Sequence, residues 1–257
     1  MSEEDHKASK NPLIVMVDEI IGEKYARAAG KKGLGENGEM QWLVKDMSNE
    51  LKAWGHPGSD GNHLILKSDN EPAIVAVREA LGRFHGGRII PESPPKGESQ
   101  SNGVIEEAGK TVREFTRVLK EQVEDKAKIK LNCDDVLVQW MTRWAAMLVS
   151  RYLVGKDGRT AYERRKGRTC RLPVLAFGET IWYKELRDKK SGAEKFSSDW
   201  REGVWLGHAR ASNEAVVGTP DGVVRAYAFK RQDEDNRWNG ERLKTIKGTP
   251  GQPDPSK

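Results

Sequence analysis

Two acidic residues, Asp69 and Glu106, stand where a carboxylate can do chemistry. Asp69 follows the apolar run LILK after a single serine, Glu106 opens a helical pattern, and 36 residues separate the two. An acid just after a strand lies at the carboxyl edge of a sheet, where open α/β folds place their sites. Two or three carboxylates on that edge suit Mg²⁺ or Mn²⁺, which prefer oxygen ligands. The chemistry predicted is two-metal phosphoryl transfer, in which the ions activate a water or a 3′-hydroxyl.

Each acid also has a simpler explanation. Asp69 stands two or three residues before a predicted helix, where an aspartate often caps the first turn. Glu106 and Glu107 lie at a predicted helix start, where the helix dipole favours acids. Taken singly, neither residue distinguishes these explanations from catalysis.

The hydrophobic pattern predicts the elements that position these acids. Apolar runs with β-type spacing predict strands, and apolar residues three and four apart predict helices. The expected order is a hairpin, a helix, a strand, a helix, a short strand and two long helices, over residues 13–18, 24–29, 39–54, 63–67, 72–81, 88–91, 105–119 and 134–153. This order is typical of an α/β fold with a mixed sheet flanked by helices.

The composition changes along the chain and predicts its division. Residues 1–11 form a polar N-terminal segment, and residues 12–154 form the α/β core. Residues 155–231 are a basic linker and a small β-rich module, in which short β-type runs alternate with glycine. We expect residues 232–257, which are polar and contain proline and glycine, to be a disordered tail.

The charge is unevenly distributed. The net charge is +5, yet the first 150 residues hold 21 Lys and Arg against 24 Asp and Glu. Residues 151–257 hold 23 Lys and Arg against 15 Asp and Glu. Such a basic half fits a polyanion such as DNA or RNA, although a basic surface without a dedicated partner has the same composition.

The sequence lacks the patterns that are typical of zinc-binding, membrane-spanning and secreted proteins. The two cysteines and five histidines have no zinc-ligand spacing, and no apolar run reaches 18 residues. The N-terminus has no apolar segment typical of a signal peptide. We expect an intracellular protein with no membrane association.

Several segments of the chain resemble, in the same order, motifs of one known protein family. SDNEPAI is similar to the strand end "SDNG-E-F" of retroviral and retrotransposon integrases, and SQSNGVIEEAGKTVRE to their helix start "PQSNG-VER-N-TL". NPLIVMVDEIIGEKYA resembles their second and third strands. GRTAYERRKGR, AFGETIWYK and WREGVWLGHARASNEAVVGTPDGVVRAY resemble later segments of the integrase core of copia-type retrotransposons, so the resemblance covers about residues 12–230.

This resemblance implies a ribonuclease-H-like fold. It also implies an activity that joins the 3′ ends of retroelement DNA to target DNA. It implies that Asp69 and Glu106 are the second and third acids of a D-D-E triad that holds Mg²⁺ or Mn²⁺. It also implies that Gln100, Asn102, Lys110 and Arg113 contact DNA, that the working form is a homo-oligomer, and that a functional copy acts in the nucleus. Ordinary helix charge explains Lys110 and Arg113 equally well, and the Asn102–Gly103 pair is also a common turn.

The first acid of the triad has no clear counterpart. In the family it lies on a strand before the one that LIVMVD resembles, and residues 1–11 contain no apolar strand. We expect that strand and acid to be absent, as in an N-terminally truncated fragment of a Pol polyprotein. Asp5 lies at a tolerable distance without a strand around it, and Asp18 lies at the end of LIVMVD, outside the triad. The chain is therefore expected to have little or no strand-transfer activity.

Three other functions fit parts of the sequence. GLGENG matches the dinucleotide-binding pattern, but the next acid at a strand end, Asp69, is 31 residues past Gly38 instead of about 20. A non-catalytic remnant that binds DNA or RNA would use the basic run 159–171 and the β module through phosphate contacts. A ribonuclease H shares the core, but the basic, β-rich C-terminal region fits an integrase better.

Overall fold

The computed structural model describes residues 12–29, 41–58, 63–93, 103–184 and 198–256. The chain divides into two compact units. Unit 1 comprises residues 1–114 and 145–170, and unit 2 comprises residues 115–144 and 171–257. The division runs through the two long helices, whereas the sequence predicted a boundary after residue 154.

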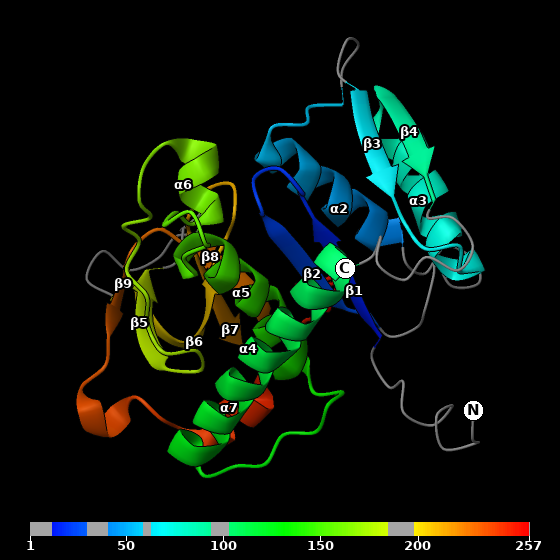
Figure 1. Ribbon diagram of the computed structural model, residues 1–257. Coiled ribbons are helices and arrows are strands. Elements are labelled where there is room, and N and C mark those ends of the chain that lie inside the picture. The colour runs from blue at the N-terminus through cyan, green and yellow to red at the C-terminus, as the bar shows by residue number, and fades with distance from the viewer. Residues whose placement is uncertain (1–11, 30–40, 59–62, 94–102, 185–197, 257) are drawn as a thin grey trace. The chain divides into compact units, whose positions relative to one another are not determined.

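Unit 1 contains two separate pairs of strands. Strands β1 (Leu13–Val17) and β2 (Lys24–Ala28) form an antiparallel hairpin. Strands β3 (His63–Lys67) and β4 (Arg88–Glu92) are parallel and are joined by helix α3 (Pro72–His85). Figure 1 shows β3 and β4 side by side with α3 against them. Within the described residues no strand bonds one pair to the other.

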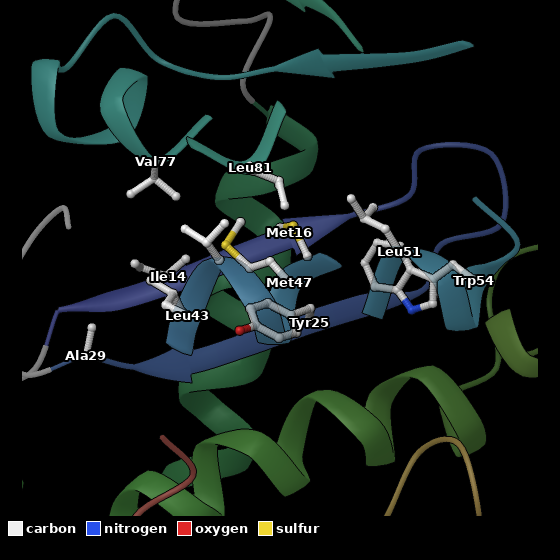
Figure 2. Close-up of a cluster of buried hydrophobic side chains, with 11 residues drawn as sticks. Ile14, Met16, Tyr25, Ala29, Leu43, Met47, Leu51, Trp54, Val77 and Leu81 are labelled. Atoms are coloured by element: carbon white, nitrogen blue, oxygen red, sulfur yellow. The ribbon is translucent and has the colours of Figure 1, made fainter. Parts of the chain in front are cut away.

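One hydrophobic cluster joins both strand pairs to helices α3 and α2 (Gln41–Trp54). Figure 2 shows Ile14 and Met16 of β1 facing Leu43 and Met47 of α2, with Leu81 of α3 at the same cluster. Leu64 and Leu66 of β3 are half-buried against it. The alternation of β3 therefore points every second side chain to this core, and its opposite face leaves Ile65 60% exposed.

Three further helices follow the strand pairs. Helix α4 (Gly103–Ala127) and helix α5 (Val136–Tyr152) are the two predicted long helices. Helix α6 (Ala161–Lys166) begins with a capping box, in which Thr160 and Glu163 bond to each other's backbone N–H. No helix of the described residues is long and apolar enough to cross a membrane.

Unit 2 is built on a five-stranded antiparallel sheet in the order β8-β7-β6-β5-β9. The strands are β5 (Thr180–Lys184), β6 (Trp200–His208), β7 (Ala215–Thr219), β8 (Gly222–Ala226) and β9 (Phe229–Arg231). Trp144 of α5 packs edge-on against Trp205 of β6, with ring centroids 5.0 Å apart. A side chain at Gly207 would place its Cβ 2.5 Å from the Trp144 ring, so only glycine fits there.

The prediction of a disordered tail over residues 232–257 is corrected by the structure. After a short 3₁₀ turn (Glu234–Asn236), helix α7 (Gly240–Thr245) buries Leu243 to 2% exposure. Trp140 Nε1 donates to the carbonyl of Gly248, and Val223 N donates to the carbonyl of Pro253. Leu243 and Ile246 are buried within this polar segment, and the average composition of the segment does not reveal them.

The predicted fold class is confirmed. The structure is α/β, with the hairpin, the parallel pair and the helices in the predicted order, followed by the β-rich module. One detail differs from the expected mixed sheet, because β3 pairs with β4 alone within the described residues.

Candidate functional site

Asp69 lies just beyond the carboxyl end of β3, as the sequence predicted. Ser68 N donates to the carbonyl of Glu92 at 3.1 Å, so pairing with the β4 side continues up to the residue before Asp69. The Asp69 side chain is exposed. The helix-capping explanation is wrong, because the N-cap of α3 is Glu71, with a proline in the first turn.

Glu106 lies in the first turn of α4, and its side chain is exposed. The same is true of Glu107, which accepts a 3.4 Å hydrogen bond from Thr111 Oγ1. An acid in this turn interacts favourably with the helix dipole, so the position is compatible with both a structural and a catalytic role.

Lys110 and Arg113 follow Glu106 on one face of α4. At about 100° per residue, the three side chains lie within about 60° of one another around the helix. All three are exposed, whereas Ala108 and Val112 of the same helix are buried. The face of α4 that carries these residues therefore presents an acid at its N-terminal end and two cations in the next two turns.

Asp18 has a structural role at the hairpin turn. Its Oδ1 accepts from the backbone N–H groups of Ile20 and Ile21, both at 2.9 Å, and its Oδ2 lies 3.1 Å from His56 Nε2. These contacts use both oxygens. They connect Asp18 to the hairpin turn and to His56.

Two arginines of the basic run 159–171 make ion pairs inside unit 1. Arg165 Nε lies 2.7 Å from Glu23 Oε1, and the Glu23 side chain is 0% exposed. Arg164 pairs with Asp157, Nε to Oδ2 at 2.9 Å, and its Nη1 also donates to the carbonyl of Ile21. These two arginines hold the hairpin turn and α6 together. The run also holds four exposed cations, namely Arg159, Lys166, Arg168 and Arg171.

The Glu23–Arg165 pair was not predicted from the sequence. Glu23 comes after the turn residue Gly22, where an acid is normally solvated. The local sequence around Glu23 does not indicate its burial, because its partner Arg165 lies 142 residues further along the chain.

Three predicted residues lie outside the described residues, namely Gln100, Asn102 and Asp5. The prediction that the first two contact DNA therefore stays a prediction, as does any contribution of Asp5 to the acidic site.

The predicted metal centre depends on the oxygen donors that the chain offers. Asp69 and Glu106 offer oxygen ligands, as Mg²⁺ and Mn²⁺ prefer. Among the residues that the structure describes, however, no group of three or more His, Cys, Asp or Glu side chains is arranged to hold a metal ion. The described acids therefore do not make a complete two-metal centre.

Comparison with known proteins gives limited likenesses. No protein-family profile and no curated protein matches the chain. Among solved structures, a chain of the simian T-cell lymphotropic virus intasome in complex with PP2A regulatory subunit B56 gamma is 15% identical, covering 86% of this chain and 72% of that chain, with a TM-score of 0.42. The catalytic core domain of BIV integrase is 19% identical, covering 61% of this chain and 86% of that chain, with a TM-score of 0.42.

Proposed function

We propose that the chain is an integrase-type core of a copia-like retroelement that binds DNA and takes part in DNA integration. One observation carries the proposal: Asp69 follows β3 and Glu106 opens α4, with Lys110 and Arg113 next to it on the exposed face of the helix. The ancestral reaction is transfer of a DNA 3′-hydroxyl onto a target phosphodiester. Mg²⁺ or Mn²⁺, a homo-oligomeric working form and a nuclear site of action belong to the same proposal.

The roles of the residues follow from their chemistry. Lys110 and Arg113 bind backbone phosphates, because each places a positive charge on the solvent-facing side of α4. Asp69 and Glu106 are acids that would ligate a divalent cation when a further carboxylate completes the set. Gln100 and Asn102 precede α4 in the sequence and are proposed to contact the same DNA.

DNA binding is tested with a fluorescent duplex of about 20 base pairs over a series of salt concentrations. We expect Lys110→Glu/Arg113→Glu to weaken binding and to reduce the slope of log K against log salt by about 1 for each phosphate that the protein no longer neutralises. Lys126→Glu/Lys128→Glu is the matched control, since it changes the same charge near the other end of α4. Equal weakening in the two variants would show a response to net charge alone and would contradict an interface at Lys110 and Arg113.

A second candidate function is a non-catalytic remnant that binds DNA or RNA. The observation that favours it is that the described acids do not form a complete metal centre. Calorimetry with Mn²⁺ separates the two functions, with Asp69→Asn/Glu106→Gln as the control. Binding that the double variant abolishes supports an integrase site. Unchanged DNA binding with no specific Mn²⁺ binding in a folded sample supports the remnant.

A further inference from the structure

His208 lies in the core of unit 2, at the carboxyl end of β6, and is 1% exposed. The rings of Trp144, Trp205 and Phe229 pack around it, with centroids 5.9, 5.6 and 6.1 Å from the imidazole centroid. These aromatic residues come from α5, β6 and β9, and all three belong to unit 2. Water has little access to the imidazole there, so its two nitrogens need hydrogen-bond partners within the protein.

Both ring nitrogens of His208 face backbone carbonyl oxygens. Nδ1 lies 3.0 Å from the carbonyl oxygen of Asn213, and Nε2 lies 2.9 Å from that of Pro173. A carbonyl oxygen only accepts hydrogen bonds, so each contact needs an N–H on the imidazole. Neutral imidazole carries one N–H, and only the imidazolium form carries two. The geometry therefore fits the protonated ring, whereas the neutral ring would oppose a nitrogen lone pair to one of the carbonyls.

Carbonyls take both ring nitrogens, so the charged groups around His208 act on it only at a distance. Arg143 Nη1 of α5 donates to the backbone oxygen of His208 at 3.2 Å, and its charge opposes an imidazolium. In the turn after β6, Arg210 and Glu214 are half-buried, and Glu214 accepts from a serine hydroxyl of that turn. On β9, Lys230 Nζ lies 4.7 Å from the ring centroid of a tryptophan on β6. In the segment 171–177 the one charged residue, the arginine at its start, is exposed. The tryptophan rings beside the imidazole favour a cation, since aromatic faces attract a positive charge within about 6 Å.

The two carbonyls belong to two different loops of unit 2. Pro173 lies in the segment between the basic run 159–171 and β5, 35 residues before His208. Asn213 lies in the turn that joins β6 to β7. The imidazolium ring therefore bonds both loops to the end of β6, and the neutral ring can donate to only one of them.

We propose that His208 is held as a buried imidazolium that fastens the loops of Pro173 and Asn213 to β6, and that unit 2 loses one of these two links when the pH rises. Histidine is the side chain whose proton exchange ordinarily falls between pH 5 and 8. The folded ring keeps a proton that an exposed histidine of the unfolded chain gives up above about pH 6.5. The stabilisation is therefore complete below that pH and is lost as the pH rises above it.

The first test is the protonation of the ring, measured by ¹⁵N NMR on the full chain at about pH 7.5, where an exposed histidine is mostly neutral. We expect hydrogens on both ring nitrogens of His208 and on one ring nitrogen of His63, which is exposed on β3. The ring signals are assigned through bonds from the backbone of each residue, so the test needs only the wild-type protein. A single N–H on the His208 ring would overturn the inference.

The second test is the unfolding of unit 2 by denaturant between about pH 7 and 8, followed through the NMR signals of its sheet in the full chain. We expect the equilibrium constant for unfolding to rise with pH in the wild type by about fivefold or more per pH unit beyond its rise in His208→Gln. His63→Gln is the matched control and is expected to keep the wild-type slope. Equal slopes in the wild type and His208→Gln would overturn the inference. Neither test measures DNA binding, so this proposal and the proposed function fail separately.

Discussion

At the scale of single residues, charge has two different uses in this chain. Lys110 and Arg113 are exposed on α4, whereas Arg165 is directed at the fully buried Glu23. Both kinds of residue look alike in the sequence, because each stands in a polar, charged segment. The structure separates solvent-exposed cations from cations that hold the fold.

Loss of the Glu23–Arg165 ion pair is expected to lower the stability of the protein strongly. We expect Arg165→Ala to lower the free energy of unfolding by about 3 kcal/mol, because Glu23 stays buried without this partner. Chemical denaturation measures the change. The double variant Arg165→Leu/Glu23→Leu is expected to recover much of the loss, and a single variant with wild-type stability would contradict the role given to the pair.

Glu124 predicts acid sensitivity in unit 2. Its hydrogen bonds from Lys120 Nζ and from the backbone N–H of Leu131, aided by the charges of Lys120 and Lys130, lower the pKa of its carboxyl to about 2. Because the folded pKa is below the unfolded one of about 4.3, this stabilisation is complete above about pH 5 and is lost as the pH falls towards 2.

The measurement is the free energy of unfolding at pH 5 and at pH 3. Glu124→Gln is expected to reduce the difference between the two values, because the glutamine side chain does not titrate. Glu121→Gln, one turn earlier on α4 and exposed, is the matched control. If Glu124→Gln leaves the pH dependence unchanged, the hydrogen bonds to its carboxylate do not contribute to stability.

At the scale of elements, helix α7 and the segment around it complete unit 2. Leu243 of α7 is buried, and Ile246 after it lies against Gly218 of the sheet. These two apolar side chains hold a polar segment against the rest of unit 2. The stability of the segment therefore depends strongly on them.

The contact predicts that Leu243→Ala lowers the free energy of unfolding by about 2–5 kcal/mol, the usual cost of removing a buried leucine. Lys244→Ala is the control in the same helix, since Lys244 is exposed and bonds to Glu241 only one turn away. Thermal unfolding compares the two. Equal transition temperatures for both variants and the wild type would support the disordered tail that the composition predicted.

At the scale of the whole molecule, the proposed function and the carboxylates available for a metal ion together predict how active the chain is. Asp69 and Glu106 provide two carboxylates, and the described residues contain no group of three metal-binding side chains. A site with fewer carboxylates binds a divalent cation more weakly.

We therefore expect the purified chain to join DNA ends at or below background in a strand-transfer assay with Mn²⁺. A variant with an upstream strand and aspartate added is the informative comparison. Joining by the unmodified chain that disappears in Asp69→Asn would contradict the expectation and would show that another acid, such as Asp5 or Asp18, completes the site.

Much of the fold was predictable because local patterns determine it. The continuous apolar run LIVMV and the 3- to 4-residue period over Met40–Trp54 identify strand and helix without knowledge of distant neighbours. The positions of Asp69 after β3 and of Glu106 in the first turn of α4 followed from the same patterns. The glycine-punctuated runs after Gly178 likewise predicted the strands of unit 2.

Only the tertiary structure decided which of these residues meet. The burial of Glu23 by Arg165, the order of the segment around Leu243 and the meeting of Pro173 with the His208 ring depend on contacts between positions far apart in the chain. Such contacts follow from packing and strand pairing over the whole chain, so the local periodicity of the sequence does not predict them. The sequence by itself therefore determined the elements and the candidate acids, and the tertiary structure decided their partners.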